Sequence, residues 1–242
     1  MPLLGRHNTP LQQTAGGLLI TLAAEPASGL WLYQRQNHAQ RIVRRLDTDP
    51  QQCWIVPVKP VHLPKPIAQH LQIELSEILQ LAPRSVWNGY LTCPLEIAIY
   101  LGGRHQLTGS TPLDLFSLSR AKYTLYGDQQ SGLLCKYWRS PLLEDIPSEP
   151  VIEQGYVALQ LRNDTARWVP VSRIVLPADT MKLYYRNDQV IVPARMELLD
   201  ERHAEISYPE RLALPDFKPV PEAIPTRKIH GFSGKFLMEA GI

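Results

Sequence analysis

Between residues 95 and 206 the chain repeats one pattern, in which apolar and polar residues alternate over short runs that Pro, Gly, Asn or Asp ends. Residues 95–101 and 157–161 are the clearest examples. Because successive side chains of a β-strand point to opposite faces of the sheet, a period of two predicts strands that bury one face. We therefore predict an all-β fold of antiparallel β-sandwich-like domains with little helix.

The proline content favours the same fold class. The chain has 22 prolines, about twice the usual usage of roughly 5%. Proline lacks a backbone N–H and interrupts helices, whereas strand ends, sheet edges and turns tolerate it. Further strands are predicted at residues 17–23, 30–35, 40–46, 52–58, 69–75, 90–92, 112–118, 121–126, 133–139, 155–162, 168–176, 181–186, 189–192, 195–199 and 204–208.

Two proline-rich segments suggest where domains end. Residues 141–150 contain three prolines and only scattered apolar residues, which is typical of a boundary or a crossover. We predict an N-terminal β domain over 1–145, a small C-terminal β domain over 146–214 and a proline-rich tail over 215–242. The tail ends with large apolar residues that water does not favour, namely Phe232, Phe236, Leu237, Met238 and Ile242. We expect it to dock on its own domain or to cross to a partner subunit.

Composition limits the classes of partner and compartment. The net charge of +2 is too small to indicate a nucleic-acid or membrane partner by its field alone. The three cysteines are odd in number and far apart, which argues against a disulfide framework and a paired-thiolate zinc site. No N-terminal signal segment and no bilayer-spanning apolar run is evident. We expect a soluble cytoplasmic protein without a cofactor.

The strongest candidate for ligand binding is a hairpin over residues 121–139. By strand parity, Lys122, Tyr126, Lys136 and Trp138 are predicted to share one face of the sheet, and Arg139 follows them. Bases interleaved with aromatic rings bind polyanions by charge, stacking and cation–π contacts. The alternative is a solvated face on which lysine stems cover aromatic rings.

Other polar groups are weaker candidates. Arg41, Arg44 and Arg45 suggest a phosphate or acidic partner, or a solvated sheet edge. Glu96 and Asp114 are two carboxylates without a known separation, and Glu96 is expected to be solvated on a polar strand face. The histidines lack metal-motif spacing, and no nucleophile elbow, P-loop or dinucleotide fingerprint occurs. We therefore predict no catalytic residue and no metal ligand.

The stretches 122–127 (KYTLYG) and 132–140 (GLLCKYWRS) resemble a block of an uncharacterised family, domain of unknown function 432 (DUF432). Residues 94–97, Asp114, Phe116 and the strand pair 157–163 and 169–176 are similar to the same family. The resemblance covers roughly residues 55–210. It implies an all-β protein and carries no activity or functional residues with it.

Three functions remain open at this point. The first is a non-catalytic binding or scaffold protein that recognises a protein or an anionic ligand, as a homo-oligomer or through self-association by the tail. The second is an enzyme or metal-binding protein whose site is assembled from distant loops. The third is nucleic-acid or polyanion binding through the hairpin. A concave pocket with displaced pKa values favours the second, whereas an exposed apolar or basic-aromatic patch favours a binding module.

Overall fold

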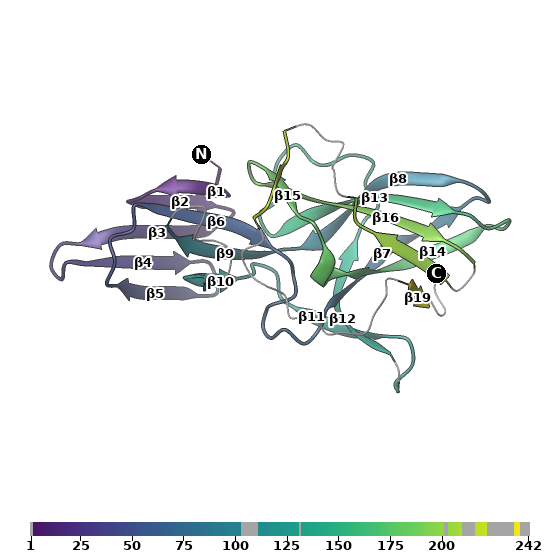
Figure 1. Cartoon of the computed structure of the whole chain (residues 1–242), viewed down its shortest axis with the longest axis horizontal. Helices are drawn as coiled ribbons and strands as arrows, with labels where there is room; N and C mark the ends of the chain where they lie inside the picture. Colours follow the sequence, from purple (N-terminus) through teal and green to yellow (C-terminus); the bar gives the residue numbers. More distant parts are fainter. Residues whose placement is uncertain are drawn as a thin grey trace. The chain divides into compact units, whose positions relative to one another are not determined.

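The structure, a computed structural model, describes residues 2–102, 111–130, 132–200, 203–209, 216–221 and 235–237. The described residues form β-strands joined by turns, with one short 3-10 helix at Ala178–Thr180 (Figure 1). The all-β prediction is therefore confirmed. Within the described residues, no helix combines the length and the apolar character needed to cross a membrane.

The chain forms two compact units that are interleaved along the sequence. Unit 1 contains Met1–Val58 and Ile97–Phe116, and unit 2 contains Lys59–Glu96 and the described part of Ser117–Val220. These units do not coincide with the predicted limits of 1–145, 146–214 and 215–242. The reason is that β9, which follows a long excursion into unit 2, lies beside β6 in one sheet of unit 1.

The described residues of unit 1 form two four-stranded sheets. One is an antiparallel meander of β2 (Leu11–Ala15), β3 (Leu18–Glu25), β4 (Leu30–Gln36) and β5 (Arg41–Leu46). The other has the order β1 (Gly5–Asn8), β6 (Gln52–Val58), β9 (Glu96–Leu101) and β10 (Asp114–Phe116). The alternation in β3 buries Leu18, Ile20 and Leu22 completely, as a period of two predicts.

The strand β9 differs from the sequence prediction. The residues that alternate with its apolar set, Glu96, Ala98 and Tyr100, are buried as well. β9 lies between β6 and β10 rather than at a sheet edge. Both faces of β9 are buried, so its apparently polar positions are core positions.

In unit 2, too, the strands that the structure describes form two sheets. The first has the order β11 (Lys122–Tyr126), β12 (Leu133–Ser140), β7 (His70–Leu81) and β14 (Val169–Pro177). The second has the order β18 (Lys218–Pro219), β15 (Tyr184–Arg186), β16 (Gln189–Leu198), β13 (Gln154–Asn163) and β8 (Val86–Pro94). β17 (His203–Ser207) pairs with β16, and β19 (Lys235–Leu237) pairs with β17.

Two strand pairs correct the expectation of purely antiparallel sheets. β12 pairs with β7 in parallel, and β13 pairs with β16 in parallel. Parallel partners require long connections, and such partners cannot be recognised from the turn residues that mark hairpins. The core prediction for β13 is confirmed, because Val157, Leu159 and Leu161 are at most 2% exposed.

The predicted apolar tail lies largely outside the described residues. This applies to Phe232, Met238 and Ile242, while Phe236 and Leu237 belong to β19. The backbone of β19 extends the second sheet of unit 2 through its ladder with β17.

Candidate functional site

The predicted ligand-binding hairpin consists of β11 and β12, and its register separates the predicted residues. Lys136 is paired with Tyr123 rather than with Lys122 or Tyr126. Residues directly opposite each other in a ladder share one face of the sheet. Lys122 and Tyr126 therefore lie on one face, and Lys136 and Trp138 lie on the other. The prediction of one shared face is wrong, because parity along each strand does not fix the register between two strands.

The five predicted residues also differ in burial. Tyr126 and Lys136 are buried, Trp138 is half-buried, and Lys122 and Arg139 are exposed. The indole Nε1 of Trp138 donates a hydrogen bond to Thr92 Oγ1 at 2.9 Å, which joins the two sheets of unit 2. Only Lys122 and Arg139 of this set present their charge to solvent.

Lys136 is held in a buried ion pair with Glu96. The Nζ of Lys136 donates to Glu96 Oε1 at 2.5 Å. The same carboxylate accepts from the backbone amides of Leu63 at 3.0 Å and His62 at 3.1 Å. Glu96 is 0% exposed, so the expectation of a solvated side chain is wrong. Its charge is compensated by one ammonium and two amides, as a buried carboxylate requires.

Burial displaces the pKa values of this cluster in opposite directions. It raises the pKa of Glu96, and Lys136 with the two amides limits that rise. Burial, together with the positive charges of Lys136 and Lys59, lowers the pKa of His62 to about 4. Desolvation disfavours the charged form of either group, which accounts for both signs.

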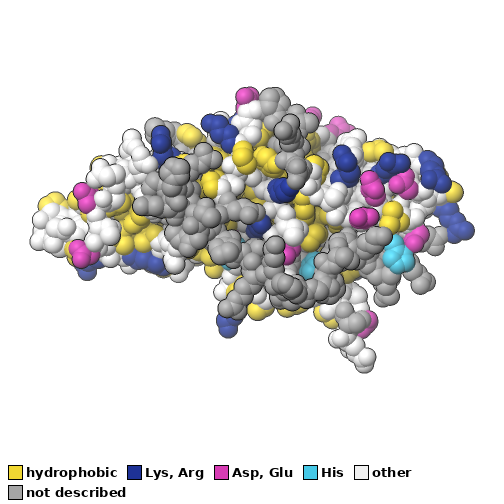
Figure 2. All heavy atoms as spheres, viewed as in Figure 1, with side chains coloured by type: hydrophobic (Ala, Val, Ile, Leu, Met, Phe, Trp, Pro, Cys, Tyr) yellow, Lys and Arg dark blue, Asp and Glu magenta, His cyan; other side chains and the backbone are white. Residues whose placement is uncertain are grey.

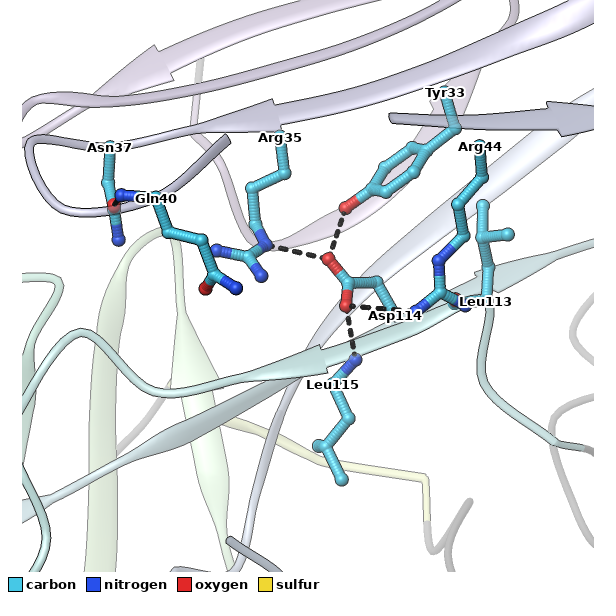
Figure 3. A network of polar contacts seen from close by, with 8 residues as sticks. All are labelled: Tyr33, Arg35, Asn37, Gln40, Arg44, Leu113, Asp114 and Leu115. Carbon is cyan, nitrogen blue, oxygen red and sulfur yellow. Dashed lines mark hydrogen bonds and ion pairs between the residues drawn. The ribbon is translucent and has the colours of Figure 1, made fainter. Parts of the chain in front are cut away.

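A second buried carboxylate, Asp114, joins the two sheets of unit 1 (Figure 3). Its Oδ2 accepts from the Tyr33 hydroxyl at 2.8 Å and from Arg35 Nε at 2.6 Å. Its Oδ1 accepts from the backbone amide of Leu115 at 3.0 Å. The Arg35 guanidinium also lies over the Phe116 ring, 4.3 Å from its centroid. All three polar side chains, of Tyr33, Arg35 and Asp114, are at most 5% exposed.

The Asp114 network has the character of a structural cluster. Burial raises the pKa of Tyr33, and the charge of Asp114 adds to that rise. A hydroxyl with a raised pKa stays protonated and continues to donate its hydrogen bond. The network therefore links β4 to β10 through a tyrosine hydroxyl that remains a hydrogen-bond donor.

The arginine cluster of β5 lies at a sheet edge. Arg44 donates to the carbonyl of Leu113 and lies 3.9 Å from Asp114 Oδ1. Arg45 contacts Glu25, and Arg41 contacts Gln34. β5 is the outer strand of its sheet. This arrangement agrees with the alternative of charged side chains at a solvated edge.

In the described part of the chain, neither the cysteine thiols nor the side chains that could bind a metal ion form a further candidate site. Cys53, Cys93 and Cys135 are free and buried, and burial raises the pKa of each thiol to about 12. A buried thiol with a raised pKa is a poor nucleophile. The described residues contain no group of three His, Cys, Asp or Glu side chains placed to hold a metal ion.

Unit 2 contains an open cleft of about 740 Å³, which we call the Arg186 cleft. The guanidinium of Arg186 lies over the Phe217 ring, 4.7 Å from its centroid. Its Nη2 donates to Gln189 Oε1 at 3.1 Å, and Gln189 Nε2 donates to the Pro147 carbonyl at 2.9 Å. The cleft is lined by Tyr90, Asp145, Ile146, Ser148, Pro150, Arg186, Asn187, Gln189 and Phe217.

The segment 141–150 forms one wall of this cleft. Leu143 and Tyr90 exchange backbone hydrogen bonds at 2.8 and 3.0 Å, which fixes the segment beside β8. The sequence analysis predicted a boundary or a crossover at 141–150. It did not predict a cleft between this segment and Arg186 or Phe217, because these two residues are far from the segment in the chain.

The fold and the site define an all-β protein of two sheet-based units with an open, mixed-polarity cleft. The chain belongs to the family described as "Protein of unknown function (DUF432)", which it matches over residues 4–239. The resemblance seen over roughly 55–210 is thus confirmed and extends in both directions. No curated protein and no solved structure matches the chain.

Proposed function

We propose that this chain is a non-catalytic binding protein and that its ligand occupies the Arg186 cleft. The observation that carries the proposal is the fixed orientation of Arg186, held by the Phe217 ring and by Gln189. A guanidinium oriented in advance loses less conformational freedom when it binds an anion. Ligand sites are typically concave, with a few polar groups fixed among apolar ones.

The ligand class follows from the chemistry of the lining. Arg186 fits a carboxylate or phosphate group, because its N–H groups match two anionic oxygens. Asp145 and the Asn187 amide offer acceptors and a donor for hydroxyl groups. Tyr90 and Phe217 supply apolar surface. A small monoanionic ligand that also carries hydroxyl groups therefore fits best.

The distribution of displaced pKa values favours binding over catalysis. Within the described residues, the groups with displaced pKa values include Tyr33, His62 and Glu96 and the three thiols, and they lie outside the cleft. Catalytic sites concentrate such groups where the substrate binds. An enzyme with a site assembled from distant loops, the second hypothesis, receives no such support from this cleft.

Calorimetric titration of the full chain with inorganic phosphate and with gluconate tests the proposal. We expect saturable binding of at least one of them, weakened about tenfold or more by Arg186→Gln, since charge-assisted bonds contribute about 1.5–3 kcal/mol. Arg162→Gln, which changes an exposed arginine outside the cleft, is the matched control and leaves the affinity unchanged. Equal affinity of the Arg186 variant and the wild type contradicts the proposal.

The remaining aspects of the proposed role concern assembly and compartment. We propose a cytoplasmic location, which the three free thiols support. A scaffold role and self-association through the tail belong to the same proposal. The ladder between β19 and β17 joins two strands of one chain, so it supports the other expectation, a tail that docks on its own domain. Polyanion binding by the hairpin is less favoured, because Lys136 is paired with Glu96 inside the protein.

A further inference from the structure

Two loops at one end of unit 2 are joined by a single buried asparagine, Asn163. Its Nδ2 donates to the carbonyls of Leu81, Ala82 and Arg167 at 3.2, 2.9 and 2.8 Å. Its Oδ1 accepts from the backbone amide and the hydroxyl of Thr165 at 2.9 and 2.7 Å. Asn163 is 0% exposed. We call the loops 82–86 and 162–168, joined in this way, the Asn163 platform.

Backbone contacts make the platform rigid. The amide of Asn163 donates to the Ser85 carbonyl at 2.9 Å, and the amide of Arg84 donates to the Thr165 carbonyl at 3.3 Å. Arg84 adopts a positive φ of 53°, a conformation that costs free energy unless its surroundings impose it. The Thr165 hydroxyl also donates to the backbone carbonyl of Arg167 at 3.1 Å and accepts from the backbone amide of Arg167 at 3.2 Å. Each loop therefore has a defined conformation before any partner arrives.

The platform presents apolar and basic side chains to solvent. Trp168 is 63% exposed and Val86 is 50% exposed. Arg84 and Arg167 are exposed beside them in the two loops, and Arg162 is paired with Asp164 at 2.7 Å. Figure 2 shows Lys and Arg side chains, with Asp and Glu side chains among them, at the end of unit 2 that carries the loops after β7 and β13, on the right of the view. On the neighbouring turn, Asp200 contacts His203 at 2.7 Å.

We propose that the Asn163 platform is a docking surface for a protein segment that carries acidic residues around an apolar group. Trp and Arg are the residues most enriched at the energetic centres of protein interfaces. The platform loops carry three arginines against one carboxylate, Asp164, so charge complementarity selects an acidic partner. The fixed loop geometry favours a shaped protein partner over a lipid surface, because preorganisation lowers the cost of a specific fit. This site is separate from the Arg186 cleft and does not depend on it.

A random peptide display library, selected on the full chain and followed by anisotropy titration of the retained peptides, tests the proposal. We expect enrichment of peptides with Asp or Glu next to a large apolar residue. Trp168→Ala weakens their binding about thirtyfold, the size expected for an interface hot spot. Arg84→Glu weakens it as well, and more strongly at low salt. The matched control Ile78→Ala changes a side chain that is 59% exposed on β7 and leaves the affinity unchanged.

Three outcomes would overturn the proposal. One is selection of peptides without acidic residues, or of peptides that bind the Trp168→Ala variant equally well. Another is Trp168-dependent retention on phosphatidylserine vesicles without peptide binding, which would assign the platform to a lipid surface. The third is a dimer in light scattering that Trp168→Ala abolishes, which would assign the surface to a second copy of the chain.

Discussion

At the scale of single residues, the buried carboxylates show where sequence reasoning stops. Alternation placed Glu96 on a polar face, whereas it is buried and bound by Lys136 and by the amides of His62 and Leu63. These partners lie 33 to 40 residues away in the chain. The alternation of apolar and polar residues along one strand contains no information about partners from other segments of the chain. The cluster around Glu96 could therefore not be predicted from the sequence.

Replacing Asp114 with Asn tests the network in unit 1. The substitution leaves the Arg35 guanidinium buried beside a neutral group, which typically costs about 3–5 kcal/mol. We expect a decrease of about this size in the free energy of unfolding, measured by urea denaturation. Arg44→Ala removes a half-exposed partner of the same carboxylate and is expected to cost at most about 1 kcal/mol. Equal losses for the two variants would show that burial does not govern the network.

The lowered pKa of His62 predicts a pH dependence of stability. In the folded protein the pKa is about 4, against an ordinary value of 6.5. As pH falls from about 6.5 toward 4, the unfolded chain binds a proton that the folded protein does not, so the free energy of unfolding decreases. Glu96 acts in the opposite direction, because its pKa is raised.

Comparing the wild type with His62→Asn isolates the histidine. The backbone amide that contacts Glu96 is kept, so the two proteins differ mainly in this titration. We expect the difference between their unfolding free energies, from urea denaturation, to shrink as pH decreases through this range. A difference that is constant with pH would refute the assignment to His62.

At the scale of elements, the hairpin of β11 and β12 shows what periodicity does and does not provide. A period of two correctly predicted both strands. It did not provide their register, which places Lys136 opposite Tyr123 and directs it toward Glu96. Register depends on the turn and on cross-strand packing, which a single strand does not encode. β9 makes the same point, because alternation predicts a solvated Glu96, whereas both faces of this strand are buried.

The two lysines of the hairpin therefore have different roles: Lys136 is buried and paired with Glu96, whereas Lys122 is exposed. Lys136→Met leaves Glu96 buried without its cation, and we expect a clear loss of stability in urea denaturation that becomes smaller at low pH, where Glu96 is protonated. Lys122→Met, at the exposed position, is expected to change stability by less than about 0.5 kcal/mol. Polynucleotide retention that Lys122→Glu and Arg139→Glu abolish without unfolding would instead support the polyanion alternative.

At the scale of the whole molecule, the fold class followed from the sequence, while the division into units did not. Contiguous domains were expected, but β9 and β10 return to unit 1 after a long excursion. The segment 141–150, predicted as a boundary or a crossover, lies within unit 2 and forms a wall of the cleft. Such contacts depend on how distant strands are assembled, so the cleft could not be recognised from local patterns.

Thiol reactivity reports on both units together. Cys53 belongs to unit 1, and Cys93 and Cys135 belong to unit 2, each at most 1% exposed. Because the thiols are buried and their pKa values are raised to about 12, we expect a disulfide reagent near neutral pH to modify them only as fast as each unit opens. All three are expected to react promptly in denaturant. Fast modification of the native protein would show that these cores are accessible.

The central claim is that the ligand binds where Arg186 is held by Phe217 and Gln189. An NMR titration of the isotope-labelled full chain with gluconate and phosphate, which follows the Arg186 Nε–H and the Gln189 and Asn187 side-chain amides, tests it most directly. The account predicts saturable shifts of these signals that are lost in Arg186→Gln, with the Arg162 signal unchanged. Shifts confined to Lys122 and Arg139, or no shifts with either anion, would contradict it.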